Sequence, residues 1–63
     1  MKLIVTIKMD NAAFDPSGTE EAARILKHVA DVIERGNFGM QVGAIMPLGD
    51  LNGNRVGEAK VTR

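Results

Sequence analysis

The 63-residue chain contains no cysteine, no tryptophan and no tyrosine, and its only histidine is His28. Without cysteine it can form no disulfide and no thiolate metal site, and one histidine cannot hold a structural zinc ion alone. Nucleophilic catalysis needs a base beside a nucleophile. The one serine, Ser17, lies where a helix should begin, and helix capping accounts for it. We therefore expect neither an enzyme nor a cofactor, and no metal site.

An excess of charge of one sign and long hydrophobic runs are also missing. Eight basic and eight acidic side chains cancel, so no long-range field attracts the protein to nucleic acid or to anionic lipid. The apolar run over 3–7 is interrupted by Thr6 and is much too short for a signal-peptide core or a membrane span. These features predict a soluble, intracellular protein with no membrane partner.

Aromatic side chains are scarce, because Phe14 and Phe38 are the only two. The core must therefore be built mainly from aliphatic residues and methionine. A chain of this size buries only roughly 60% of the surface that its unfolded form exposes, so its stability should be marginal. Self-association commonly compensates for a small core, which makes a homodimer an alternative to a monomer.

The first segment alternates apolar and polar residues with the period of a strand, which we predict over 2–9. Turn-forming residues follow over 10–18 and predict a loop. Phe14 is the large apolar side chain of that loop. We expect it to cover one end of the core.

A helix is predicted to begin either at Asp15-Pro16 or at the capping box Ser17-Gly-Thr-Glu20. One apolar stripe follows, and we expect it to face the sheet: Ala22, Ile25, Leu26, Val29 and Ile33. His28 lies on the opposite, charged face and should be exposed. Acid-first pairs four residues apart support the helix at Glu20 with Arg24 and at Asp31 with Arg35, and Gly36 should end it.

The carboxy-terminal half is predicted to form a β-hairpin that turns at Asn52-Gly53, since this pair accepts positive φ at both central positions of a tight turn. The strand over 38–46 should turn its larger residues toward the helix, and Pro47 should confine it to a sheet edge. The strand over 55–62 should bury Gly57, Ala59 and Val61. The whole predicts an α+β fold, a single β-α-β-β domain over 1–63 with one amphipathic helix on one face of a three-stranded antiparallel sheet. The third strand should lie between the other two, and a parallel pairing of the first two strands is the alternative.

Alternating oxygen-bearing residues in Asp50-x-Asn52-x-Asn54 are similar to the opening of a calcium loop. Arg55 stands where such a loop needs glycine, and Val61 stands where it needs a bidentate glutamate. A hairpin turn, in which Asp and Asn side chains accept hydrogen bonds from the local backbone, is therefore favoured.

Two surfaces are candidates for binding a partner. The sheet face away from the helix should carry apolar residues that a protein partner or a second copy of the chain would cover: Ile4, Thr6, Gln41 and Ile45. The alternative is nucleic-acid binding by the basic residues of the first and third strands: Lys2, Lys8, Arg55, Lys60 and Arg63. Glu58 and the missing stacking aromatics count against this alternative.

Several segments together resemble a family of short, uncharacterised proteins encoded by bacteriophages and prophages. They are Met-Lys-Leu-Ile-Val-Thr-Ile-Lys-Met-Asp-Asn-Ala-Ala-Phe at 1–14, Ala-Arg-Ile-Leu at 23–26, and Asp-Leu-Asn-Gly-Asn-Arg-Val-Gly at 50–57. The stretch over 39–49 is longer and more apolar than this family leads one to expect. The resemblance implies an accessory protein in a bacterial host cell that binds a host protein, with CRISPR and other defence components as possible targets. It assigns no activity to any residue.

Overall fold

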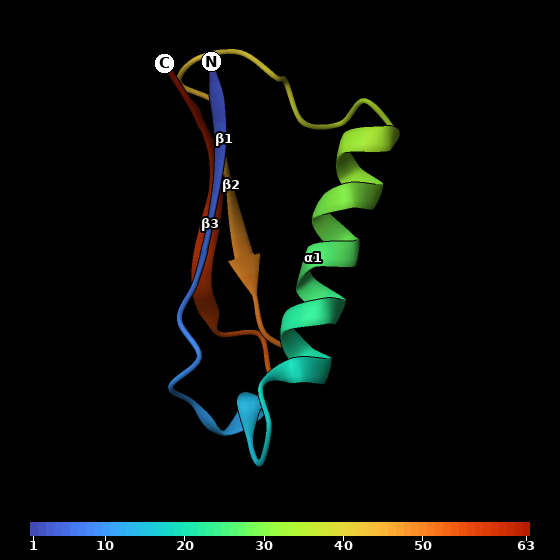
Figure 1. Cartoon of the computed structure of the whole chain (residues 1–63). Helices are drawn as coiled ribbons and strands as arrows, with labels where there is room; N and C mark the ends of the chain where they lie inside the picture. The colour runs from blue at the N-terminus through green and yellow to red at the C-terminus, as the bar shows by residue number, and fades with distance from the viewer.

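A computed structural model describes all 63 residues, and its elements follow the order predicted from the sequence. Strand β1 (Lys2–Ile7) is followed by the 3₁₀ turn η1 (Ala12–Phe14) and the helix α1 (Thr19–Glu34). Strands β2 (Ile45–Gly49) and β3 (Arg55–Thr62) complete the chain. Figure 1 shows α1 packed along one face of the sheet, with both termini at the end where α1 finishes.

The sheet is antiparallel throughout and has the order β1-β3-β2, which confirms the predicted topology and excludes a parallel pairing of the first two strands. On the β1 side, Ile4 pairs with Lys60 and Thr6 pairs with Glu58. On the β2 side, Ile45 pairs with the same Lys60. The central strand β3 therefore holds both edge strands in register.

The core lies between α1 and the inner face of the sheet. Its most deeply buried large side chains are Ile25 of α1 and Leu48 of β2, and Ala59 and Val61 of β3 line the sheet side. Burial of Ala59 and Val61 confirms the predicted inner face of β3. Leu26 was predicted to face the sheet and is instead 48% exposed. The buried residues of α1 are Glu21, Ile25 and Val29, which lie four positions apart on one side of the helix, and Leu26 stands at the border of that side.

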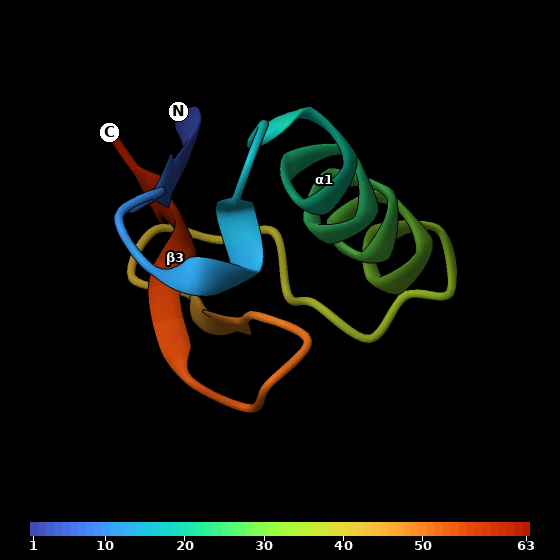
Figure 2. The ribbon, with the colours of Figure 1, turned by 90° about the horizontal axis from the view of Figure 1, so that it is seen from below.

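Phe14 closes one end of this core, as predicted. Asn11 caps η1 by accepting a hydrogen bond from the Ala13 backbone N–H at 3.0 Å, which holds Phe14 in a buried position. Figure 2 views the molecule from that end and shows η1 crossing between the sheet and α1.

The predicted strand over 38–46 is wrong, because the chain turns over 38–44 and enters β2 only at Ile45. Gly43 has a φ of 97°, which belongs to a turn and not to a strand. Phe38 reaches the core from this segment, whereas Met40 and Val42 are exposed. The first strand is also shorter than predicted and ends at Ile7, although the Lys8 N–H still donates to the Val56 carbonyl at 2.7 Å.

The hairpin between β2 and β3 turns where the sequence predicts, but its loop is longer than a two-residue turn. Asp50 N–H donates to the Asn54 carbonyl, and only Gly53 has positive φ, at 86°. The pairing then shifts by one residue between Leu48 and Gly49. This bulge turns Val56 into the core, although strict alternation would have placed it on the outer face.

Local sequence signals predicted the carboxyl end of α1 but not its amino end. The helix begins at Thr19 without a side-chain cap, so neither Asp15 nor the predicted capping box starts it. Ser17 accepts a hydrogen bond from the Thr19 N–H at 3.2 Å. The carboxyl end agrees with prediction, since Gly36 has a φ of 74° directly after the last turn. The helix is neither long enough nor apolar enough to cross a membrane.

Candidate functional site

The outer face of the sheet, which α1 leaves uncovered, carries a row of three residues from three strands. Ile4, Lys60 and Ile45 lie side by side because both isoleucines pair with Lys60. Ile4 is 37% exposed and Ile45 is 58% exposed. Two aliphatic side chains thus flank one cation on an open surface.

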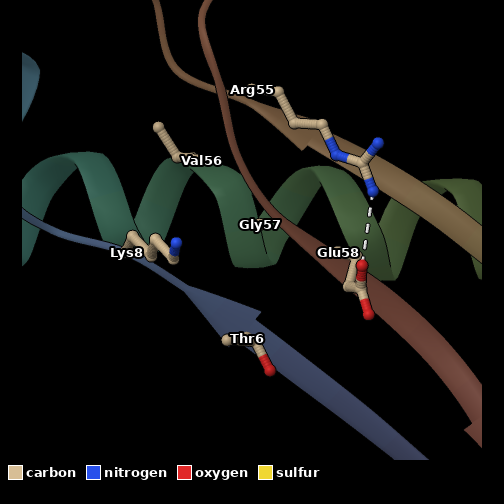
Figure 3. A pocket seen from close by; sticks show the side chains of 6 residues that line it. All are labelled: Thr6, Lys8, Arg55, Val56, Gly57 and Glu58. Carbon is tan, nitrogen blue, oxygen red and sulfur yellow. Dashed lines mark hydrogen bonds and ion pairs between the residues drawn. The ribbon is translucent and has the colours of Figure 1, made fainter.

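The next row of the outer face borders a hollow of about 430 Å³ between β1 and β3. Figure 3 views this hollow with α1 behind the strands and labels its lining: Thr6, Lys8, Arg55, Val56, Gly57 and Glu58. Gly57 carries no side chain to fill this space. A Cβ atom at Gly57 would collide with the carbonyl group of Thr6, so the two strands approach closely only because glycine is there.

Charges on this face are partly neutralised by Glu58. Its carboxylate lies 3.3 Å from Arg55 and 3.7 Å from Lys60, and it is the one acidic group among them. Lys8 makes no ion pair. The surface is therefore mixed, with apolar, cationic and anionic side chains adjacent to one another.

The structure brings together some of the residues that were predicted to bind a partner and separates others. Ile4, Thr6 and Ile45 share the outer face, but Gln41 lies in the turn before β2 because that part of the chain is not a strand. Among the basic residues, Lys8, Arg55 and Lys60 lie in or beside the hollow. Lys2 pairs with Thr62, next to Arg63, at the opposite end of the sheet.

Strand β1 is an open edge. The Lys8 N–H bonds to Val56, and hydrogen-bonded pairs alternate along an antiparallel ladder, so the even-numbered residues of β1 bond to β3. The N–H and C=O groups of the odd-numbered residues Leu3, Val5 and Ile7 consequently point away from the sheet. No other strand pairs with this side of β1.

The opposite edge, β2, is blocked in part. By the same alternation, the backbone polar groups of Ile45, Pro47 and Gly49 face the free edge of β2. Pro47 has no N–H group to donate there. The two edges of the sheet therefore differ. Proline interrupts the outward-facing N–H groups of β2, whereas Leu3, Val5 and Ile7 of β1 each have an N–H group that faces outward.

A buried polar network joins the hairpin loop to η1. Asp50, which is almost fully buried, accepts hydrogen bonds from the Asn52 and Asn54 N–H groups at 2.9 Å each. Its other oxygen accepts from the Asn11 amide at 2.7 Å and from the Asn54 amide at 3.3 Å. These contacts confirm the predicted turn chemistry. Asp50 belongs to no cluster of three or more potential metal ligands.

The network continues into α1 through Glu21, which is also buried. The Arg24 guanidinium donates to both Glu21 oxygens, at 2.7 and 3.0 Å, and the Leu51 N–H donates to one of them at 2.7 Å. Arg24 also donates to the Gly49 carbonyl at 3.1 Å. The predicted pair Glu20–Arg24 is therefore wrong, whereas Asp31–Arg35 is present at 3.0 Å.

Sequence reasoning did not find this network. Glu21 has no i+4 partner on α1, and the groups that satisfy it come from Arg24 and from a loop thirty residues away. An acidic residue in line with the apolar Ile25 and Val29 was the available signal, because position 21 lies on the same helical stripe.

These hydrogen bonds set the ionisation of both carboxyl groups. The Arg24 hydrogen bonds lower the pKa of Glu21 below its ordinary value of 4.5, against the opposing effect of burial and with help from the Leu51 N–H. Burial raises the pKa of Asp50, but the donors from Asn54, Asn11 and Asn52 together outweigh it and leave that pKa below 3.8. Both groups are charged in the folded protein at neutral pH.

We expect the protein to lose stability on acidification. Because folding lowers both pKa values, the unfolded chain takes up protons first as the pH falls. The contribution of the two carboxylates to the free energy of unfolding is therefore fully present above about pH 5. It should decline as the pH passes through 4.5 and 3.8 and continue to decline below them. Urea titrations at a series of pH values measure this, and Glu21→Gln should make the decline shallower. An unfolding free energy that stays constant down to about pH 3 would contradict the assignment.

In comparisons with known proteins, no family model, no curated protein and no solved structure matches this chain.

Proposed function

We propose that this chain is a small non-enzymatic phage or prophage accessory protein that acts by binding another protein, with a host defence component, such as one of a CRISPR system, as its target. The observation that carries the proposal is the uncovered outer face, where Ile4 and Ile45 are exposed on either side of Lys60. The phage origin comes from the sequence resemblance.

The character of this face supports a protein partner. Interfaces between proteins combine an apolar centre with a polar rim. Here the two isoleucines form the apolar part, and Lys8, Arg55 and Glu58 surround the neighbouring hollow. The buried carboxylates Glu21 and Asp50 each accept several hydrogen bonds that hold the loops together, and this structural role accounts for their burial.

Capture from a bacterial host lysate tests the proposal, with the wild-type chain and two matched variants as bait. Ile45→Glu places a charge on the outer face, and Leu26→Glu places the same charge on the exposed side of α1. We expect the wild-type chain and Leu26→Glu to retain the same host protein and Ile45→Glu to lose it. Capture of nothing but the bait, or equal capture by all three, would overturn the proposal.

A second copy of the chain is the other protein that would cover this face. Sedimentation velocity over a wide concentration range distinguishes the two cases. A mass of one chain that does not change with concentration excludes self-association. A dimer that Ile45→Glu dissociates would show that a second copy of the chain, and not a host protein, covers this face.

Nucleic-acid binding is the second candidate, and the grouping of Lys8, Arg55 and Lys60 at the hollow favours it. Glu58 pairs with two of these three cations, and both phenylalanines are buried, so no aromatic ring is available to stack on a base. We expect no shift of random duplex or single-stranded DNA in a low-salt gel. A shift that weakens as salt rises would establish this candidate instead.

A further inference from the structure

We infer that β1 is a site of strand addition, which takes an extended segment of a partner protein that has acidic residues at its two ends and apolar residues between them. This inference rests on the proposed function, since it specifies the chemistry of the protein partner. The backbone of β1 would supply the hydrogen bonds, and its side chains would select the segment.

The backbone of β1 is prepared for such an addition. Leu3, Val5 and Ile7 each direct one N–H and one C=O toward the free edge, and the strand contains no proline and no bulge. Natural sheets usually protect such an edge with charged side chains, proline or a bulge. Pro47 obstructs β2 in this way, whereas β1 has no proline and carries only Lys2 and Lys8, one on either side of its three outward-facing residues.

The inner side of β1 is incompletely covered. Leu3 is 40% exposed, and Val5 and Ile7 are only partly buried against the core. A strand added beside β1 would place alternate side chains next to these three residues and extend the apolar face of the sheet. Those positions of the incoming segment should therefore be apolar.

The charges of two lysines determine which residues the incoming segment should carry on the outer face of the sheet. Lys2 is the first residue of β1, and Lys8 directly follows its last residue. Both are even-numbered, like the outer-face residues Ile4 and Thr6, and neither makes an ion pair. Opposite charges directly across two strands stabilise the pair, and like charges destabilise it. A segment with an acidic residue opposite each lysine, six positions apart, is the complement of this edge.

The same rule argues against a second copy at this edge. Two copies of β1 can pair antiparallel about a two-fold axis at Val5. This register alone lets all the outward-facing residues pair with one another, because Val5 lies opposite Val5 and Leu3 lies opposite Ile7 of the other copy. That register places Lys2 opposite Lys8 at both ends. The acidic segment avoids this repulsion and uses the same backbone groups.

A synthetic peptide tests the inference: acetyl-Glu-Val-Ile-Val-Thr-Val-Glu-amide, with binding measured by isothermal titration calorimetry against the intact protein. In the antiparallel register, the second, fourth and sixth residues of the peptide bond to β1. N-methylation of the second and fourth residues should weaken binding about tenfold, and N-methylation of the third and fifth should leave it unchanged. Equal effects of the two modifications, or no binding of the parent peptide, would overturn the inference.

Charge reversal provides a second, independent test. The double variant Lys2→Glu/Lys8→Glu should bind the acidic peptide about fivefold more weakly and should bind the same peptide with lysine at both ends better than the wild type does. Because affinity is regained in the swapped pair, loss of folding cannot explain the result. A variant that binds neither peptide, or both equally, contradicts the role of the two lysines.

The two proposals fail separately. If host-protein capture depends on Ile45 but the peptides do not bind, the strand-addition inference fails and the proposed function stands. If the peptide binds with the expected N-methyl pattern and the lysate yields no partner, the proposed function fails.

Discussion

Gly57→Ala is expected to lower the stability of the protein severely and to shift its unfolding to a much lower urea concentration. The added Cβ atom would overlap the carbonyl group of Thr6, and every atom that it meets belongs to the backbone of the paired strand β1. Overpacking usually costs about 1–3 kcal/mol when side chains can yield, and backbone yields less. A domain of this length has a total stability of roughly 3–9 kcal/mol, so the substitution removes a large share of it.

Circular dichroism during urea unfolding measures this effect, with Gly49→Ala as the matched control. Gly49 lies on the neighbouring strand with an ordinary negative φ, and a Cβ there would meet only the Asn54 carbonyl at 3.7 Å. We expect the control to unfold near the wild-type urea concentration. If Gly57→Ala does the same, the close approach of β1 to β3 at Gly57 is contradicted.

Asp50→Ala is expected to release the hairpin loop from η1 and to cause a second large loss of stability. The substitution leaves the backbone N–H groups of Asn52 and Asn54 without their acceptor, and it also removes the partner of the Asn11 amide. Unpaired polar groups at a buried site oppose folding. Amide hydrogen exchange should show faster exchange in the loop 50–54 and in η1, together with a lower urea midpoint.

Asn52→Ala serves as the control for this experiment, because Asn52 is exposed in the same loop and its side chain makes no hydrogen bond. Its exchange rates and its urea midpoint should stay close to those of the wild type. Equal effects of the two substitutions would show that the loop depends on its backbone alone and would contradict the anchoring role of Asp50.

Local sequence patterns predicted the fold but located the candidate surface only in part. Period-two alternation marked β1, and Asn52-Gly53 marked the hairpin, because both signals depend on neighbouring residues alone. Gln41 was assigned to the outer face from the same kind of alternation, and this failed because the chain turns at Gln41 and β2 begins only at Ile45. The hollow beside Lys8 was not predicted, since it arises where Gly57 meets Thr6 across two strands.

The sequence by itself determined the order of the elements, the end of the helix at Gly36 and the pairing of β3 between its neighbours. These follow from backbone preferences and from the need to bury one apolar face. Only the tertiary structure decided that Glu21 and Asp50 are buried and that a bulge turns Val56 inward. Burial of the two carboxylates depends on which distant segments meet, and hydrogen bonds between residues thirty or more positions apart leave no periodic trace in a sequence.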